Sequence, residues 1–374
     1  MPRLVETLAA ELEQLRERGL YRFLQRVDSP QGARITIDGR LLLNFSSNDY
    51  LGLANHPALI AAATRAIEQW GVGAGASRLL CGNLAPYEEL ERKLAALKRK
   101  EAAVVFASGY AANVGTIPSL VGENDVVILD KLVHASLVDG ARQSGATIRV
   151  YPHNNLQKLK QILSRCAKFR RRLIVTETVF SMDGDFAPLA DIVAIKEQYD
   201  AWLMLDEAHA TGVFGPNGAG LAAQCGLEEQ VDISVGTLSK ALGCVGGFVA
   251  GSRTLIDFLR NKARSLIYST ALPPAICAAA EVALDIATGE EGNRRRAKLW
   301  ENMRMLGART PIWPVPVGEE SKAVELSARL RERGLLVPAI RYPTVPKGKA
   351  RLRASVTAAH SAEDITRLQH ELAR

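Results

Sequence analysis

Short runs of apolar residues alternate with longer amphipathic stretches through most of this 374-residue chain. The short runs predict strands at residues 102–106, 125–129, 147–151, 172–176, 201–205, 233–235 and 247–250. The amphipathic stretches predict helices at residues 111–120, 134–144, 156–168 and 189–199. Because parallel strands need a crossover between them, this alternation is typical of an α/β protein with a mainly parallel sheet.

The rhythm of the pattern changes after about residue 290. It then predicts helices at 292–306 and 320–333 and strands near 313–315, 337–340 and 352–356, which indicates a smaller α+β domain. A hydrophobic content of 47% is enough for a large core. We therefore predict an N-terminal helix and hairpin segment at residues 1–50, a large α/β domain at 51–289 and a small C-terminal domain at 290–374.

The composition favours a cytoplasmic protein without a membrane span. No apolar run reaches the roughly 18 residues of a membrane helix, and residues 1–20 resemble a charged amphipathic helix rather than a signal peptide. The five cysteines are widely spaced and support neither a disulfide framework nor a zinc site. The net charge of +7 weakly favours an anionic partner such as coenzyme A or an acidic carrier protein, although scattered basic residues usually form solvated faces.

The strongest chemical signal is Lys240, which lies 34 positions after the aspartate of the string Asp206-Glu207-Ala208-His209. Asp206 follows the predicted strand 201–205, and ligands of open α/β sheets bind beyond the carboxyl ends of the strands. Pyridoxal phosphate needs a lysine for its Schiff base and an acid facing its pyridine nitrogen. Each residue alone also has an ordinary interpretation, as a surface lysine, a strand-end aspartate or a loop histidine.

Further candidates surround this cofactor hypothesis. Thr237 and Ser239 place hydroxyls within one turn of the lysine amine. Ser108-Gly109-Tyr110 precedes a helical pattern, so its amides can hold a phosphate at the positive end of the helix dipole, or can form a simple glycine turn. His134 begins another helical stretch, where it can stack on a planar ring or only cap the helix.

The string Asp206-Glu207-Ala208-His209 also spells the box of a family of nucleic-acid helicases, and the basic charge balance would suit that function. A helicase needs a phosphate loop of the form Gly-x-x-x-x-Gly-Lys-Ser/Thr, which this sequence lacks. We therefore predict no nucleic-acid partner.

Taken together, the strings resemble the α-oxoamine synthases, fold-type I pyridoxal phosphate enzymes that condense an amino acid with an acyl thioester and release carbon dioxide. The resemblance runs from about residue 20 to the C-terminus. It is carried by the strings at residues 44–53, 108–113, 134–136, 180–185, 206–209, 237–243, 268–274, 343–346 and 351–353. It implies a large mainly parallel-sheet domain, a smaller C-terminal domain and pyridoxal 5'-phosphate as the cofactor.

The resemblance also assigns roles around the cofactor ring. It implies that Lys240 forms the Schiff base, Asp206 faces the pyridine nitrogen, His209 and Ser181 contact the ring oxygen, and His134 stacks on the ring. The phosphate seat would comprise Gly109, Tyr110, Thr237 and Ser239 of one subunit with Ser269 and Thr270 of its neighbour. A shared site of this kind implies a homodimer.

On the substrate side, the resemblance implies that Arg353 holds a carboxylate, a role that suits its bidentate fork, and that Arg22 and Thr344 contact substrate. A relative that kept only cofactor binding would not need Arg353, Thr344 and His134 together. One departure concerns the pocket for the thioester, because Tyr87 stands where the family usually has histidine, three residues before Leu90-Glu91.

The choice of substrate follows from finer details of the same resemblance. The strings at residues 48–50, 339–341, 343–346 and 357–360 favour a member that takes L-alanine with pimeloyl carrier protein or pimeloyl coenzyme A. A sister enzyme that uses glycine with acetyl coenzyme A shares much of this pattern, and it or another α-oxoamine synthase with a different acyl thioester remains the alternative.

Overall fold

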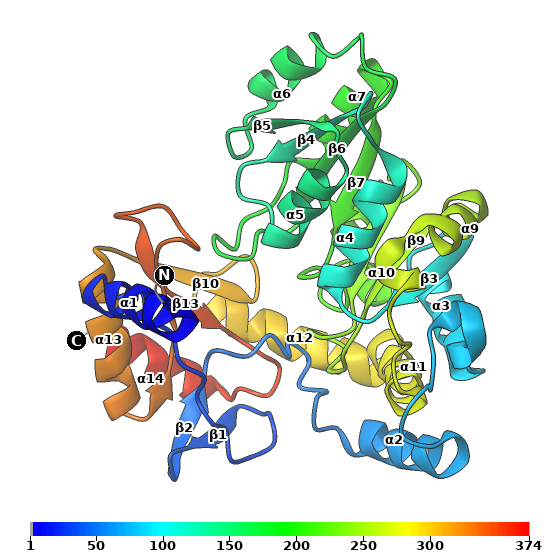
Figure 1. Ribbon diagram of the computed structural model, residues 1–374. Helices are drawn as coiled ribbons and strands as arrows, with labels where there is room; N and C mark the ends of the chain where they lie inside the picture. The colour runs from blue at the N-terminus through cyan, green and yellow to red at the C-terminus, as the bar shows by residue number, and fades with distance from the viewer. Residues whose placement is uncertain (1–2, 374) are drawn as a thin grey trace.

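Within residues 3–373, which the computed structural model describes, seven strands form one central sheet in the order β3-β9-β8-β7-β6-β4-β5 (Figure 1). Their bounds are β3 (Ala102–Phe106), β4 (Val126–Asp130), β5 (Thr147–Tyr151), β6 (Arg172–Glu177), β7 (Trp202–Asp206), β8 (Ile233–Thr237) and β9 (Gly247–Gly251). Only β9 is antiparallel to its neighbours, β3 and β8. The predicted mainly parallel α/β sheet is therefore confirmed.

Helices pack around this sheet, and those that lie between its strands in the sequence connect them (Figure 1). They are α2 (Pro57–Trp70), α3 (Pro86–Leu97), α4 (Gly109–Leu120), α5 (Ala135–Gln143), α6 (Leu156–Leu163), α7 (Leu189–Gln198), α8 (Leu221–Gln224), α9 (Arg253–Lys262), α10 (Arg264–Ile267) and α11 (Pro274–Thr288), with short turns η1 (Arg78–Gly82) and η2 (Pro216–Gly218). Every residue of β3, β4, β8 and β9 is buried, which explains why their apolar runs were readable. Helix α6 ends five residues before the predicted bound, where the Ser164 hydroxyl donates to the Gln161 carbonyl and competes with helical bonding.

The C-terminal part of the chain forms a smaller lobe. It contains α12 (Glu290–Met305), β10 (Ile312–Gly318), α13 (Glu320–Glu332), β11 (Leu335–Leu336), β12 (Ala339–Ile340), β13 (Ala350–Ser355) and α14 (Ala362–Leu372). Strands β10, β13 and β12 form an antiparallel sheet in that order. Of the predicted strand at 337–340, only Ala339–Ile340 forms a strand, β12, because Pro338 has no amide hydrogen for a ladder; Leu335–Leu336, just before the predicted bounds, form β11 of another sheet.

The N-terminal segment joins the same lobe. Strands β1 (Arg34–Ile37) and β2 (Arg40–Asn44) form a hairpin, and β11 pairs with β2 in parallel. Ahead of them, α1 (Leu4–Glu17) has no buried residue, and its leucines at 4, 8, 12 and 15 are exposed. Among residues 3–373, no helix combines the length and apolarity that a bilayer crossing requires.

Candidate active site

A cavity of about 240 Å³ opens beyond the carboxyl ends of β7 and β8. It is lined by Ser108, Gly109, Tyr110, Asn113, His134, Ser136, Glu177, Asp206, Ala208, His209, Thr237, Ser239 and Lys240. Eight of these are residues that the sequence proposed: Gly109, Tyr110, His134, Asp206, His209, Thr237, Ser239 and Lys240. The fold thus gathers segments from positions 108 to 240 at the edge of the sheet where ligands of α/β proteins bind.

Lys240 lies in the loop between β8 and β9, and its Nζ is 2.8 Å from Nε2 of His209. Burial lowers the pKa of Lys240 to about 8, although the negative charges of Asp206 and Glu177 act in the opposite direction. A lysine with this pKa has an appreciable neutral fraction near pH 7, and the neutral amine is the form that attacks a carbonyl or accepts a proton.

His209 connects Lys240 to a chain of polar groups that ends at Arg353. The Tyr50 hydroxyl is 2.6 Å from Nδ1 of His209 and donates to Asn48 Oδ1 at 3.2 Å, and Nη2 of Arg353 donates to the same oxygen at 3.1 Å. Because the hydroxyl has one proton, it accepts from Nδ1–H, which leaves Nε2 as the acceptor that faces Lys240. Burial lowers the pKa of His209 well below its ordinary value and raises the pKa of Tyr50 to about 12, so both are neutral at pH 7.

Asp206 is held in place from two sides. Its Oδ2 accepts from Nδ2 of Asn113 at 2.8 Å, and its Oδ1 accepts from the amide of Ala208 at 2.9 Å. Asn113 lies one turn inside α4 and also donates to the Ser136 hydroxyl. These contacts hold both oxygen atoms of Asp206 and so fix the orientation of its carboxylate at the end of β7.

Glu177 is a second acid in the cavity. It ends β6, opposite Asp206 in the parallel register, and is 3% exposed. Burial, reinforced by the negative charge of Asp206, raises the pKa of Glu177 to about 8, so its carboxyl group is largely protonated at pH 7. Within residues 3–373, its Oε1 and the Oδ1 of Asn113 are buried without a hydrogen-bond partner.

His134 caps α5, one of the two roles that its position in the sequence allowed, and it also lines the cavity, while stacking on a ring stays a prediction. Its Nδ1 accepts from the amide of Ser136, so the neutral imidazole has its proton on Nε2. Burial lowers the pKa of His134, although Asp206 opposes this effect.

The opposite wall of the cavity offers hydroxyls and amides. Ser108 caps α4 by accepting from the Ala111 amide, so Gly109 and Tyr110 occupy the first helical positions, whose amides have no partner within the helix. Thr237 donates to the Gly246 carbonyl at 2.8 Å, and its oxygen is 2.7 Å from the Ser239 hydroxyl. This wall suits an anion such as a phosphate.

Arg353 and Ser181 lie close to the cavity without lining it. Arg353 of β13 is 5% exposed, and its Nε donates to the Ser181 carbonyl at 2.6 Å while its Nη1 donates to the Ser355 hydroxyl at 2.7 Å. The positive charge of Arg353 contributes to the lowered pKa values of Lys240 and His209, as expected for a cation nearby.

Four other residues that the sequence proposed lie outside the cavity. The side chains of Arg22 and Thr344 are exposed, and Ser269 and Thr270 lie in the segment after α10, where Thr270 pairs with Ser77. Tyr87 does not line the cavity either; it is buried, and its hydroxyl donates to the Leu272 carbonyl at 3.2 Å.

Sequence reasoning gave no role to Asn48, Tyr50, Asn113 or Glu177. Asn113 belongs to the string 108–113 that supported the family resemblance, but its contacts with Asp206 and Ser136 join it to other segments. Asn48 and Tyr50 belong to the string 44–53 that supported the family resemblance, but their contacts with His209 and Arg353 join segments more than 150 positions apart. Such contacts have no signature within a local pattern.

The fold and the site together define a fold-type I pyridoxal phosphate enzyme, in which a half-buried lysine, an aspartate and a helix N-terminus meet at the sheet edge. The chain belongs to the aminotransferase class I and II family, whose model matches residues 40–372. The predicted fold class and family are therefore confirmed.

The curated relatives with high identity are 8-amino-7-oxononanoate synthases. The chain is 48% identical over 374 residues to the 8-amino-7-oxononanoate synthase of Thermoanaerobacter pseudethanolicus, covering 96% of this chain and 94% of that protein. It is 43% identical over 372 residues to 8-amino-7-oxononanoate synthase 1 of Bacillus subtilis, with coverage of 96% and 94%.

Solved structures place the fold in the same group. Serine palmitoyltransferase from S. paucimobilis, bound to a pyridoxal phosphate–myriocin aldimine, superposes with a TM-score of 0.93 at 33% identity, over 99% of this chain and 97% of that one. The 8-amino-7-oxononanoate synthase of Francisella tularensis superposes with a TM-score of 0.77 at 28% identity, over 88% and 96%. Both enzymes are α-oxoamine synthases, as the sequence resemblance predicted.

Proposed function

We propose that this protein catalyses the decarboxylative condensation of L-alanine with a pimeloyl thioester, the reaction of an 8-amino-7-oxononanoate synthase in biotin synthesis. The observation that carries the proposal is the amine of Lys240, which lies 2.8 Å from Nε2 of His209 in a cavity that is also lined by Asp206. Curated relatives with this name, at 43–48% identity over nearly the whole chain, support the choice of substrates.

The cavity fits pyridoxal phosphate by its chemistry. Two buried oxygen atoms, Oε1 of Glu177 and Oδ1 of Asn113, have no partner within residues 3–373, and a polar ligand would give them one. Lys240 would hold the cofactor aldehyde, Asp206 its pyridine nitrogen and the N-terminus of α4 its phosphate, with His134 over the ring. Thr237 and Ser239 would add hydroxyls at the phosphate, and His209 and Ser181 would serve the ring oxygen. When bound, the cofactor supplies an electron sink for the carbanion formed at Cα of the amino acid.

The side chains of this site suit the proton transfers of the reaction. Lys240, with its pKa lowered to about 8, is the base that removes the Cα proton of the amino acid. His134 keeps its proton on Nε2 and donates it as a hydrogen bond to the thioester carbonyl or to the departing carboxylate. Arg353 donates three hydrogen bonds within the protein and keeps two further N–H groups for the substrate carboxylate. Arg22 and Thr344 complete the substrate side in this proposal.

The active form is proposed to be a homodimer. Ser269 and Thr270 lie outside the cavity of their own chain, which fits a role at the phosphate of the partner subunit. Two large apolar side chains near these residues are exposed: Tyr268, which directly precedes Ser269, by 72%, and Leu80, which follows Ser77, the pairing partner of Thr270, by 81%. Apolar exposure of this kind is typical of a surface that another subunit covers. Light scattering measures the assembly directly, and a particle with the mass of one chain would contradict the homodimer.

A substrate panel tests the proposed reaction. Purified protein loaded with pyridoxal phosphate is given L-alanine, glycine or L-serine, each with pimeloyl, acetyl or palmitoyl coenzyme A, and with pimeloyl carrier protein. We expect L-alanine to change the visible absorbance of the bound cofactor, and carbon dioxide to be released fastest with a pimeloyl thioester. Faster turnover of glycine with acetyl coenzyme A, or of L-serine with palmitoyl coenzyme A, would transfer the assignment to a sister enzyme.

A further inference from the structure

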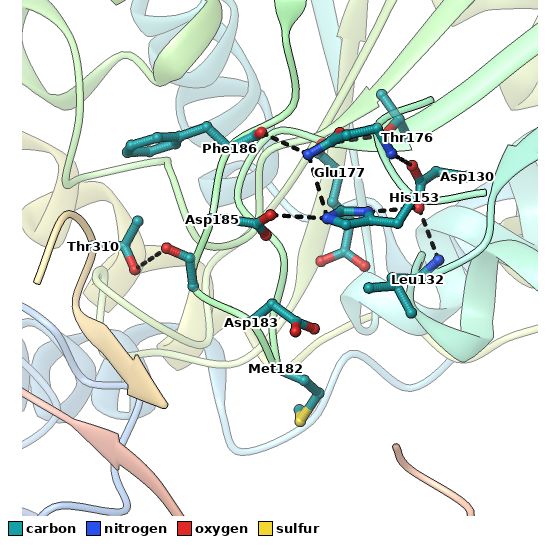
Figure 2. A network of polar contacts seen from close by, with 12 residues as sticks. Asp130, Leu132, His153, Thr176, Glu177, Met182, Asp183, Asp185, Phe186 and Thr310 are labelled. Atoms are coloured by element: carbon teal, nitrogen blue, oxygen red, sulfur yellow. Dashed lines mark hydrogen bonds and ion pairs between the residues drawn. The ribbon is translucent and has the colours of Figure 1, made fainter. Parts of the chain in front are cut away.

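A second polar network lies beside the cavity and is centred on His153, in the turn after β5 (Figure 2). Nδ1 of His153 is 3.0 Å from Oδ1 of Asp130, and Nε2 is 2.8 Å from Oδ2 of Asp185. A neutral imidazole has one N–H group, and an ionised carboxylate only accepts hydrogen bonds. Two carboxylates therefore pair best with an imidazolium that donates from both nitrogens.

Asp130 is the fixed end of this network. It ends β4, its side chain is buried, and Oδ1 also accepts from the Leu132 amide at 2.8 Å. Its Oδ2 accepts from the Asn154 amide at 2.9 Å, which ties the turn that contains His153 to the sheet. His153 is thereby anchored to the large lobe.

Asp185 belongs to residues 180–186, a segment after β6 that we call the β6 loop. The loop is closed by hydrogen bonds from the Phe180 amide to the Asp185 carbonyl and from the Gly184 amide to the Phe180 carbonyl. The ring of Phe180 packs edge-on against His153 at 4.3 Å between centroids, and Nδ2 of Asn154 donates to the Phe186 carbonyl. The turn that contains His153 thus holds the β6 loop at both of its ends.

The other side of the β6 loop contacts the small lobe (Figure 2). The Ser181 carbonyl accepts from Arg353, Asp183 pairs with Arg351 at 2.6 Å, and the Gly184 carbonyl accepts from the Thr310 hydroxyl at 2.9 Å. Gly184 has a φ of +64°, and a Cβ there would lie 2.4 Å from the Ile312 carbonyl oxygen, so the two lobes approach closely at this point.

We propose that His153 is a positioning residue: its imidazolium bridges Asp130 of the sheet and Asp185 of the β6 loop, holds the loop in place like a clamp, and so fixes Arg353 for the substrate carboxylate. The clamp itself follows from the contacts, while its effect on amino-acid binding rests on the proposed function. Burial alone would lower the pKa of His153, but the hydrogen bonds to Asp130 and Asp185 outweigh it and raise the pKa to about 10. The charged groups that face the ring are these two carboxylates, one from β4 and one from the loop.

The first test reads the charge of His153 in the holoenzyme. The chain has six histidines, so ¹⁵N-histidine labelling gives few signals, and His153→Gln identifies the relevant one. We expect an imidazolium with two protonated nitrogens up to about pH 9, and Asp185→Asn should shift its titration to lower pH. A neutral His153 at pH 8 would overturn the proposal.

The second test follows the loop and the substrate together. In His153→Gln and Asp185→Asn we expect faster amide hydrogen exchange in residues 180–186 and a rise of about tenfold in KM for L-alanine, with kcat changed less. His370→Gln, at an exposed position near the end of α14, is the matched control and should change neither quantity. Unchanged exchange, or unchanged KM despite faster exchange, would overturn the positioning role.

The experiments distinguish a failure of the proposed function from a failure of the His153 clamp. If the wild-type protein does not turn over L-alanine, the charge of His153 and the exchange of residues 180–186 still decide whether the clamp exists. Binding of each amino acid, followed by the absorbance of the bound cofactor, then shows whether the clamp acts on the carboxylate of another substrate.

Discussion

At the scale of single residues, burial sets the charge states of this site. Lys240, His209 and Tyr50 are withdrawn from water, so each favours its neutral form at pH 7 more than it would in solution. Lys240 gains a neutral amine, and His209 becomes an acceptor on one side and a donor on the other. The chemistry therefore depends on the hydrogen bonds that orient these groups.

Tyr50→Phe tests that orientation. The ring keeps its buried position, but Nδ1 of His209 loses its 2.6 Å partner and Asn48 loses a donor. We expect kcat/KM for L-alanine to fall by roughly tenfold, which corresponds to the 1–3 kcal/mol of an unmade buried hydrogen bond, and the absorbance of the bound cofactor to titrate at a changed pH. Tyr199→Phe, which removes a hydroxyl far from the cavity, should match the wild type in both measurements, and equal behaviour of the two variants would contradict the role of Tyr50.

Glu177→Gln tests the protonated acid. The folded-state pKa of about 8 exceeds the ordinary value of 4.5, so the folded state binds an extra proton between these pH values and stability falls as pH rises through this window. Glutamine has the shape of the neutral acid and removes this loss. In the cofactor-free protein we expect the variant to gain roughly 2–4 °C in Tm over wild type at pH 8 and little at pH 4.5. A gain that is the same at both pH values would show that Glu177 is already ionised.

At the scale of elements, α4 contributes two groups from one face. Gly109 and Asn113 are four positions apart, so the amides of the first turn and the Asn113 side chain point to the same cavity. One helix therefore provides both the amides proposed to bind the phosphate and the side chain that donates to the Asp206 carboxylate.

Asn113→Ala separates these contributions. The helix N-terminus stays intact, but Asp206 loses its 2.8 Å donor. We expect the affinity for pyridoxal phosphate to fall by about 10- to 100-fold, measured by titration of the cofactor-free protein, while the fold is retained. Asn124→Ala, at an exposed position before β4, is the control. An unchanged affinity would mean that the Ala208 amide alone is enough to fix Asp206.

Elements were predictable where burial and local chemistry agree. The strands of the central sheet fell within two residues of their predicted bounds, because most of them are buried over their whole length and are therefore continuous apolar runs. The late start of β12 at Ala339 follows from the missing amide hydrogen of Pro338, and the early end of α6 at Leu163 from the hydrogen bond of the Ser164 hydroxyl to the Gln161 carbonyl. The apolar pattern alone does not show how these backbone groups are bonded. In the site as well, the local sequence pattern predicted Lys240 and Asp206, but it did not predict the contact of Tyr50 with His209, which lie 159 positions apart.

At the scale of the whole molecule, the site is proposed to be complete only in a dimer. Lys240 lies in the cavity of its own chain, whereas Thr270 lies outside it. Lys240→Ala and Thr270→Ala would then damage different halves of each shared site. A mixed dimer would contain one site with both changes and one site with neither.

Complementation between the two variants tests this arrangement. Each variant alone should lose most of its activity, with Lys240→Ala reduced by at least about 10²-fold. After the two are mixed at equal amounts and allowed to exchange subunits, random pairing should restore about a quarter of the wild-type activity. Mixing Lys240→Ala with His134→Ala, two changes within one cavity, should restore none. Equal recovery in both mixtures would contradict a shared site.

The exposed leucines of α1 have a further consequence for handling the protein. An isolated 14-residue helix is only marginally stable in water, and α1 buries none of its side chains within its own chain. If the proposed dimer covers α1, the order of this helix would depend on that contact. Trypsin, which cuts after Arg16 only where the helix is unwound, should then act at this residue slowly at high protein concentration and rapidly on dilution. The rate of cleavage near the N-terminus would then report what fraction of the protein is in the proposed dimer.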